Sequence, residues 1–282
     1  MLKKAYLEIT NVCNMDCSFC HKTAREKRVM SEEEFELLTD RLRGRAEQLY
    51  FHLMGEPTLH PLLPKFVRRA REKGFLPIIT TNGTLLGRVG EALIAAAPYK
   101  VSISLHAPAA NAAFADAAYL DNCIVFARRA AEGGAYVALR LWNLGGDGEG
   151  ENAAILSRLR AEFDGDWVNI RDGASQRIAT RIFLEWGEHF DWPDLRAPAA
   201  SVDADAFCYG LRDQIGVLCD GSVVPCCLDA DGVITLGNLF DGELERYYPE
   251  KLEMTKENVF AFWKLFRKEC SFPLETRGTN NS

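Results

Sequence analysis

The feature of the sequence that most limits its fold is a regular alternation of short apolar runs with amphipathic segments. The apolar runs are rich in β-branched and aromatic residues and have the length of buried strands. They occupy residues 5–10, 49–53, 76–80, 101–105, 136–142 and 167–170. Strands that alternate with helices at even spacing predict parallel βαβ units rather than an antiparallel sandwich. We therefore expect an α/β fold, a partial (β/α)6 TIM-like barrel.

Helical segments are expected between these strands, over residues 31–43, 64–73, 87–96, an alanine-rich run that ends at 129, and 152–163. The first has the clearest start, because Ser31 is a good N-cap and Glu34 stands at the capping-box position. In parallel sheets of this kind, ligands bind at the carboxyl ends of the strands, in the loops that follow them. Functional residues are therefore expected in those loops.

The alternation of strand-like and helix-like segments ends near residue 200. Pro193, Pro198 and the alanine- and aspartate-rich residues up to 206 indicate a linker. Residues 215–225 then alternate in the manner of a β-hairpin, with its turn at Asp220-Gly221. An aromatic-rich helix is expected over residues 255–268. We predict two domains, a partial barrel at residues 1–200 and a small C-terminal β-hairpin plus helix domain at residues 201–282.

Composition narrows the class of protein. The net charge of −7 argues against a nucleic-acid-binding protein, and no apolar stretch reaches the roughly 20 residues that a membrane-spanning helix needs. The first residues lack the pattern of a signal peptide. We expect a cytoplasmic protein with neither nucleic acid nor membrane as partner. Thiols stay reduced in that compartment, so the nine cysteines need an explanation other than disulfides.

Three of the cysteines stand close together directly after the first expected strand. Cys13, Cys17 and Cys20 are spaced Cys-x3-Cys-x2-Cys, and thiolates on one loop can converge on one metal centre. Soft thiolate ligands favour an iron–sulfur cluster or zinc. A cubane held by three cysteines leaves one iron with an open position for a cofactor or substrate. The alternative is a structural zinc site with His21 as the fourth ligand.

The cysteine loop, with aromatic Phe19 before its last cysteine, resembles the signature of the radical S-adenosylmethionine (radical SAM) superfamily. Met54-Gly55-Glu56-Pro57, after the second strand, is similar to the family's glycine-glycine-glutamate-proline motif, with methionine replacing the first glycine. Thr80-Thr81-Asn82-Gly83, after the third strand, resembles the family's threonine-asparagine-glycine sequence. Each motif follows its own strand, and the resemblance covers about the first two-thirds of the chain.

The resemblance implies a [4Fe–4S] cluster on the three N-terminal cysteines, with S-adenosylmethionine chelating its fourth iron. Glu56 and its neighbours would bind the amino group of this cofactor. Ser104 and Arg140, near the ends of the fourth and fifth strands, occupy places where the family often contacts ribose and carboxylate. The cofactor-binding residues expected on this basis are Phe19, Gly55, Glu56, Pro57, Thr81, Asn82, Ser104 and Arg140.

The second group of cysteines lies near the C-terminus. Cys208, and Gly221 followed five residues later by Cys226, resemble an element of SPASM and twitch domains, which carry auxiliary [4Fe–4S] clusters. Cys270 resembles a later ligand, but Pro273 stands where the family supplies one more cysteine. Cys227 or Cys219 could complete the set, and buried structural cysteines are the alternative. The expected ligands are Cys208, Cys226, Cys227 and Cys270, whereas Cys123 is expected in the core.

The resemblance implies an enzyme that reductively cleaves S-adenosylmethionine to a 5′-deoxyadenosyl radical, which then abstracts hydrogen from a substrate. We expect the modification or oxidation of a peptide, with an electron donor such as flavodoxin or ferredoxin as partner. One alternative is an aminocyclitol-like small-molecule dehydrogenase. Another is an iron–sulfur electron-transfer or structural metal-binding protein without cofactor cleavage. His52, within an apolar strand, is expected to be a core histidine, and no catalytic acid or base can be named.

Overall fold

The computed structural model describes residues 1–111, 113–146, 148–165, 167, 175–189, 192 and 210–247. Its strands form one ten-stranded sheet in the order β10-β9-β8-β1-β2-β3-β4-β5-β7-β6. They are β1 Leu2–Leu7, β2 Ala46–Tyr50, β3 Leu76–Thr81, β4 Lys100–Ser104, β5 Tyr136–Leu144, β6 Ser175–Ala179, β7 Ile182–Glu188, β8 Gln214–Val217, β9 Ser222–Val224 and β10 Gly237–Asn238.

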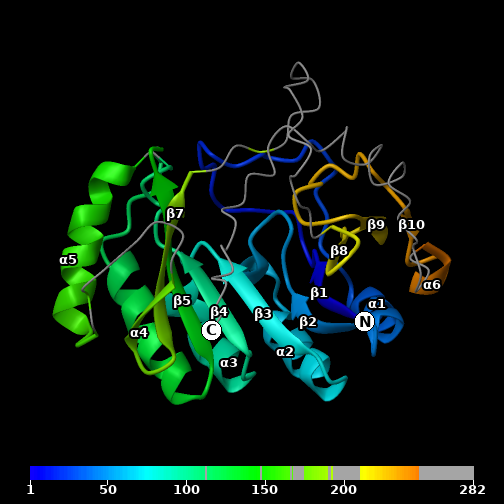
Figure 1. Ribbon diagram of the computed structural model, residues 1–282, viewed down its shortest axis with the longest axis horizontal. Coiled ribbons are helices and arrows are strands. Elements are labelled where there is room, and N and C mark those ends of the chain that lie inside the picture. The colour runs from blue at the N-terminus through cyan, green and yellow to red at the C-terminus, as the bar shows by residue number, and fades with distance from the viewer. Residues whose placement is uncertain are drawn as a thin grey trace, which may run out of the picture.

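The helices that connect the parallel strands cover one face of this sheet (Figure 1). They are α1 Glu32–Leu42, α2 Leu63–Glu72, α3 Leu86–Ala95, α4 Tyr119–Glu132 and α5 Asn152–Glu162, and a short α6 spans Leu244–Tyr247. Two 3-10 turns lie at Pro57–Leu59 and Glu149–Glu151. The expected capping box is present, because the Ser31 side chain accepts from the backbone of Glu34 and the Glu34 side chain accepts from that of Ser31. The α/β partial barrel is confirmed.

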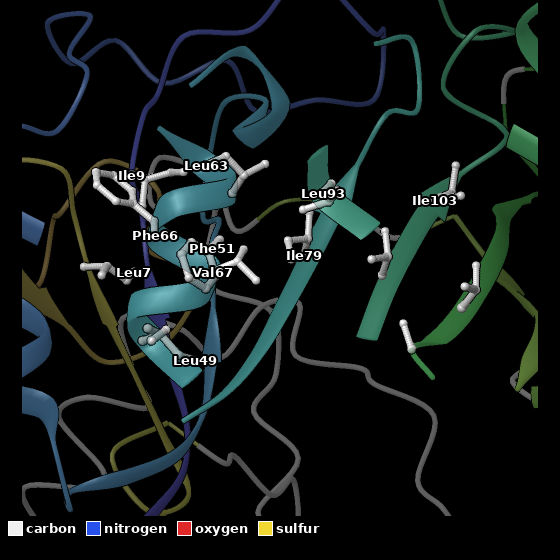
Figure 2. Close-up of a cluster of buried hydrophobic side chains, with 14 of the residues drawn as sticks. Leu7, Ile9, Leu49, Phe51, Leu63, Phe66, Val67, Ile79, Leu93 and Ile103 are labelled. Carbon is white, nitrogen blue, oxygen red and sulfur yellow. The ribbon is translucent and has the colours of Figure 1, made fainter. Parts of the chain in front are cut away.

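The main core lies between the helices and the sheet. Leu7 of β1, Ile79 of β3 and Phe51, the residue after β2, point toward the helices and are fully buried there (Figure 2). The rings of Phe35 and Phe66 stack with centroids 4.0 Å apart and join α1 to α2. Because side chains alternate along a strand, the polar residues between these apolar ones face the other, concave side of the sheet.

The sixth parallel strand is not where the sequence pattern placed it. Trp167 lies in neither a helix nor a strand, and residues 168–170 are outside the described residues. The sixth parallel position is taken by β7, which pairs with β5. Strand β6 pairs antiparallel with β7 and forms the edge of the sheet. The chain thus reaches this sixth parallel position through an additional hairpin, which a simple strand-helix alternation does not anticipate.

The predicted hairpin near the C-terminus is present, with β8 and β9 paired antiparallel on either side of the Asp220-Gly221 turn. Strand β8 also pairs in parallel with β1, so the hairpin extends the barrel sheet (Figure 1). The expected linker, the expected helix at 255–268, Cys208 and Cys270 lie outside the described residues, and the domain boundary at 200/201 stays a prediction. In the part of the chain that is described, no helix has the length and apolar character needed to cross a membrane.

Candidate cofactor site at the carboxyl edge of the sheet

The cysteine loop leaves the sheet after β1 and returns before α1. Its base is closed by an isolated antiparallel bridge between Thr10 and Val29. The Thr10 hydroxyl donates to the carbonyl oxygen of Arg28 at 2.9 Å, and the Asn11 amide donates to that of Glu26 at 2.8 Å. These bonds fix the two ends of the loop, so the cysteines between them are presented at the carboxyl edge of the sheet.

The cysteine loop rests against the segment that follows β4. The backbone N–H of Ser18 donates to the carbonyl oxygen of Ala110 at 2.9 Å, and the Cys17 thiol donates to that of Ala107 at 3.6 Å. The rings of Phe19 and His106 lie 5.2 Å apart. Cys17 is buried, Cys20 is half-buried and Cys13 is exposed. The loop is therefore held against this segment by a backbone hydrogen bond, by the Cys17 thiol and by the contact of two rings.

The three thiols are close enough to influence one another's ionisation. Burial, and then the negative charges of Cys13 and Cys20, raise the pKa of Cys17 to about 12. Burial also raises the pKa of Cys13. Thiolates packed this closely need positive charge between them, which an iron–sulfur cluster supplies. The donor set therefore fits such a cluster.

A mononuclear zinc site fits less well. Among the described residues, no group of three or more His, Cys, Asp or Glu side chains is arranged to hold a single metal ion. The proposed fourth ligand, His21, instead places its Nε2 2.6 Å from a carboxylate oxygen of Asp231. An iron–sulfur cluster is larger than one ion and accepts cysteines that stand further apart.

The Gly55-Glu56 turn passes directly beneath the cysteine loop. Gly55 has φ +77°, and a Cβ atom at this position would lie 2.5 Å from the carbonyl oxygen of Thr10. Only glycine satisfies both the backbone conformation and this close approach. The next residue, Glu56, donates its backbone N–H to the carbonyl oxygen of Val12 at 2.8 Å. The turn and the loop thus form one structure.

The Glu56 carboxylate is the centre of the site and is only 2% exposed. Its Oε1 accepts from the Thr58 hydroxyl at 2.6 Å and from the Thr81 hydroxyl at 2.7 Å, and its Oε2 accepts from the backbone N–H of Asn82 at 2.7 Å. Burial raises the pKa of Glu56, while these hydrogen bonds oppose the rise. From the described residues, Oε2 accepts one hydrogen bond and keeps acceptor capacity for an ammonium group.

Asn82 connects this carboxylate to the cysteine loop. Its side-chain amide donates to Asn14 at 3.0 Å, and Asn14 donates in turn to the hydroxyl of Thr84 at 2.8 Å. The Tyr119 hydroxyl donates to the carbonyl oxygens of Asn82 at 2.9 Å and Ser104 at 3.3 Å. The structure therefore brings together the cysteine loop, Glu56, Thr81 and Asn82. Pro57 begins the 3-10 turn that follows Glu56.

Ser104 and Arg140 lie opposite each other in the β4–β5 pairing. The Arg140 Nε donates to Glu185 at 2.9 Å, and its guanidinium carbon is 4.4 Å from the ring centroid of Trp142. Lys100 binds the other oxygen of the same carboxylate at 2.7 Å. Sequence reasoning missed Glu185, which lies on the strand that was not anticipated. A cofactor contact through Ser104 or Arg140 stays a prediction.

The buried ion pair of Glu8 with Arg25 was also missed. Arg25 contacts both carboxylate oxygens, at 2.8 and 2.7 Å, and Glu8 also accepts from the backbone N–H groups of Met54 and Cys219. The acid in an otherwise apolar first strand was the available signal. Arg25 donates further to the carbonyl oxygen of Ala230 at 2.8 Å. The segment after the cysteine loop is thereby tied to the C-terminal part of the chain.

The C-terminal cysteines differ in their surroundings. Cys219 is fully buried on the helix side of the sheet, and its thiol donates to the carbonyl oxygen of Ile9 at 3.7 Å. Cys226 is buried, whereas Cys227 is half-buried and packs against the cluster of Tyr6, Leu53, Leu218 and Val224. Cys123 lies in the main core, as predicted. The metal-binding roles of Cys226 and Cys227 stay predictions.

Comparison with known families defines the class of protein. Residues 7–124 match the radical SAM superfamily, and residues 208–271 match the SPASM iron-sulfur cluster-binding domain. The N-terminal part of the chain is thus a radical SAM domain, and the C-terminal part is a SPASM domain. The match indicates a [4Fe–4S] cluster and S-adenosylmethionine as cofactors, and a SPASM domain is one that binds auxiliary iron–sulfur clusters.

Individual relatives add little to this assignment, because each matches only part of the chain. A tungsten-containing aldehyde ferredoxin oxidoreductase cofactor-modifying protein of Pyrococcus furiosus is 39% identical over 89 residues, which cover 30% of this chain and 25% of that protein. The Fe-coproporphyrin III synthase of Methanosarcina barkeri is 36% identical over 83 residues, 28% of this chain and 21% of that protein. The chain thus matches about a quarter of the length of these relatives.

Solved structures share the fold over most of the chain. BtrN in complex with AdoMet and 2-DOIA has a TM-score of 0.58 at 18% identity, covering 96% of this chain and 93% of BtrN. SuiB of Streptococcus suis, bound to precursor peptide SuiA, has a TM-score of 0.55 at 14% identity, covering 89% of this chain and 66% of SuiB. At such identities the likeness establishes the fold alone.

Proposed function

We propose that this enzyme generates a 5′-deoxyadenosyl radical in the site around Glu56 and uses it to abstract hydrogen from a substrate in the half-barrel. The observation that carries the proposal is the single hydrogen-bonded unit formed by the cysteine loop, Glu56 and Asn82. When bound, the cluster and S-adenosylmethionine supply the electron and the scissile sulfonium bond. The chain supplies positioning and exclusion of water.

In this proposal the cofactor-binding residues have distinct tasks. Cys13, Cys17 and Cys20 hold the cluster at the mouth of the half-barrel. Glu56 binds an ammonium group through Oε2, because its buried charge otherwise lacks a cationic partner among the hydrogen bonds described above. Ser104 lies at the end of β4, one strand further along, and is proposed to contact the ribose.

The substrate and the electron donor belong to the proposal as well. The sequence leaves two substrate classes, a peptide as the first expectation and an aminocyclitol-like small molecule as the alternative. The fold is shared with a peptide-bound protein, SuiB, and with BtrN, whose complex contains 2-DOIA. An electron donor such as flavodoxin or ferredoxin would reduce the cluster. The C-terminal cysteines would hold an auxiliary cluster that takes up the electron left when the substrate radical is oxidised.

The test is the formation of 5′-deoxyadenosine by anaerobically reconstituted protein after reduction with dithionite. We expect the wild type to form it and Cys17→Ser to form none, because that variant lacks one of three cluster ligands. Cys123→Ser is the matched control, since Cys123 is a cysteine of the main core, and it is expected to retain the activity. A wild-type protein that carries the cluster but yields no 5′-deoxyadenosine would refute the proposal.

A further inference from the structure

The concave face of the sheet carries a layer of polar and aromatic side chains below the cofactor site. Tyr6 of β1 stacks on Tyr50 of β2 with ring centroids 4.7 Å apart, and both rings contact His52 edge-on, at 5.6 and 5.9 Å. On the other side, Lys100 of β4 and Arg140 of β5 bind Glu185 of β7. Strand β3 lies between these two groups in the sheet.

In the part of the chain that the structure describes, three buried polar atoms of this layer have no hydrogen-bond partner. They are Nδ1 of His52, Oγ1 of Thr80 and Oγ of Ser102. Ser102 is completely buried. Thr80 and Ser102 face each other in the β3–β4 pairing, and the ladder that joins β2 to β3 continues to Phe51, next to His52. The three atoms therefore form a row across three neighbouring strands.

A row of unpartnered groups is unusual, because a buried polar atom without a partner destabilises the folded protein. Side chains of the same size without hydroxyl groups would fit the same positions. The core on the helix side shows the usual arrangement: the buried hydroxyl of Thr39 donates to the carbonyl oxygen of Phe35 at 2.7 Å and accepts from Lys73 at 2.8 Å. The polar row thus indicates a ligand that completes these hydrogen bonds.

The position of the row suits a substrate. Thr80 and Ser102 each precede a cofactor-site residue, Asn82 and Ser104, by two positions on the same face of the sheet. Two residues of extended strand span roughly 6.6 Å, so the row lies one layer deeper in the half-barrel than the cofactor site. A ligand on the row would lie directly below the cofactor.

The width and chemistry of the row define the class of ligand. Strands are about 4.8 Å apart, so three neighbouring strands spread the polar atoms over about 9.6 Å. Burial and the charge of Arg140 lower the pKa of His52 to about 3, so its imidazole is neutral and can accept or donate one hydrogen bond. A single serine or asparagine side chain of a peptide reaches one or two of these positions. A ring with polar groups on opposite sides reaches all three.

We propose that His52, Thr80 and Ser102 bind a small cyclic substrate that carries several hydroxyl or amino groups. This assignment rests on the proposed function, because it places the substrate of that reaction. Tyr6 and Tyr50 would provide the apolar wall beside the ring, and the row of His52, Thr80 and Ser102 would determine which carbon faces the cofactor.

The test combines thermal unfolding with ligand titration on anaerobically reconstituted protein that holds S-adenosylmethionine. The probes are myo-inositol and glucosamine, with cyclohexanol as a control that carries one hydroxyl group. We expect myo-inositol or glucosamine to raise the Tm of the wild type and cyclohexanol to have no effect. In Thr80→Val and in Ser102→Ala the dissociation constant of the bound probe should rise about tenfold or more.

Thermal unfolding without a probe separates ligand binding from a structural role. Without probe, Thr80→Val and Ser102→Ala should unfold at the wild-type temperature or up to a few degrees Celsius above it, because they lose an unpartnered hydroxyl. Thr39→Val is the matched control: it should unfold at lower temperature, because that hydroxyl is hydrogen-bonded to Phe35, Glu36 and Lys73, but should bind the probe as the wild type does.

Several results would overturn the assignment. One is that Thr80→Val and Ser102→Ala are less stable than the wild type. Another is that both variants bind the probe with unchanged affinity. A third is that the wild type binds a serine-containing peptide but neither myo-inositol nor glucosamine. The formation of 5′-deoxyadenosine is measured on the same wild-type preparation. Its absence counts against the proposed function, whereas its presence without binding of either ring counts against this assignment alone.

Discussion

At the scale of single residues, the site depends on a glycine that has no possible substitute. Gly55 combines φ +77° with an approach that would leave a Cβ atom 2.5 Å from a backbone oxygen of the cysteine loop. No side-chain movement could relieve the clash of an added Cβ atom, because the atom that it would contact belongs to the backbone of Thr10. The conformation of Gly55 is what allows the following residue, Glu56, to point its carboxylate toward Thr81 and Asn82.

The variant Gly55→Ala is therefore expected to lose at least about 3 kcal/mol of unfolding free energy, from left-handed strain together with the clash. Chemical denaturation at pH 7 measures this loss. Gly74→Ala is the matched control, because Gly74 has φ +92° but open space around the missing Cβ, and it should lose about 1 kcal/mol. Equal losses in the two variants would contradict the close approach at Gly55.

At the scale of elements, α1 and α2 are joined by ion pairs above their apolar contact. Glu36 of α1 binds Arg69 at 2.7 Å and Lys73 at 2.8 Å. Hydrogen bonding to Arg69, supported by Lys73, lowers the pKa of Glu36 to about 2 from the ordinary value of 4.5. Because the folded-state pKa is the lower one, the stabilisation is fully present above pH 4.5 and is lost as the pH falls toward 2.

Glu36→Gln should therefore lower the Tm at pH 7 by about 2–4 °C. The difference in Tm between the wild type and this variant should shrink as the pH is lowered from 5 to 3, which thermal unfolding across that range measures. Glu33, an exposed acid on the same helix, offers the control substitution Glu33→Gln at a position without these two partners. A difference that stays constant with pH would exclude the charge of Glu36 as its cause.

Helices and turns could be predicted from the sequence where the residues that determine them are close together in the chain. The capping box at Ser31 and the apolar spacing of α1 depend on residues within one helix, and the Asp220-Gly221 turn depends on two neighbours. The cofactor motifs were predictable because each follows its own strand. In contrast, the pairing of β8 with β1 joins residues about 210 positions apart and has no local signature. The same holds for the binding of Arg140 to Glu185, which required the position of β7.

At the scale of the whole molecule, one buried ion pair links distant parts of the chain. Glu8, the residue after β1, is completely buried. It joins Arg25, after the cysteine loop, to the backbone of Met54 and to that of Cys219, two residues after β8. Thr23 and His21 bind Asp231 in the same region, at 2.5 and 2.6 Å. The cysteine loop and the C-terminal hairpin are therefore positioned relative to each other by buried charge.

Removing one member of the Glu8–Arg25 ion pair should lower the free energy of unfolding. Arg25→Gln leaves the Glu8 carboxylate buried without a cation, and we expect a loss of about 3–5 kcal/mol in unfolding free energy. The double variant Glu8→Gln with Arg25→Gln should recover part of the loss, because no charge stays buried. Lys22→Gln, which breaks the exposed pair with Asp16, is the control and should leave the stability unchanged. Equal losses in the single and double variants would contradict the argument.

The central claim is that the cysteine loop and Glu56 form one cofactor site. Electron paramagnetic resonance of the reduced, reconstituted protein, recorded with and without S-adenosylmethionine, tests it most directly. We predict that the cofactor changes the signal of the N-terminal cluster in the wild type. In Glu56→Gln the change should need a cofactor concentration at least about tenfold higher, because this variant lacks the carboxylate that we propose binds the ammonium group. A wild-type signal that is identical with and without S-adenosylmethionine would contradict the account.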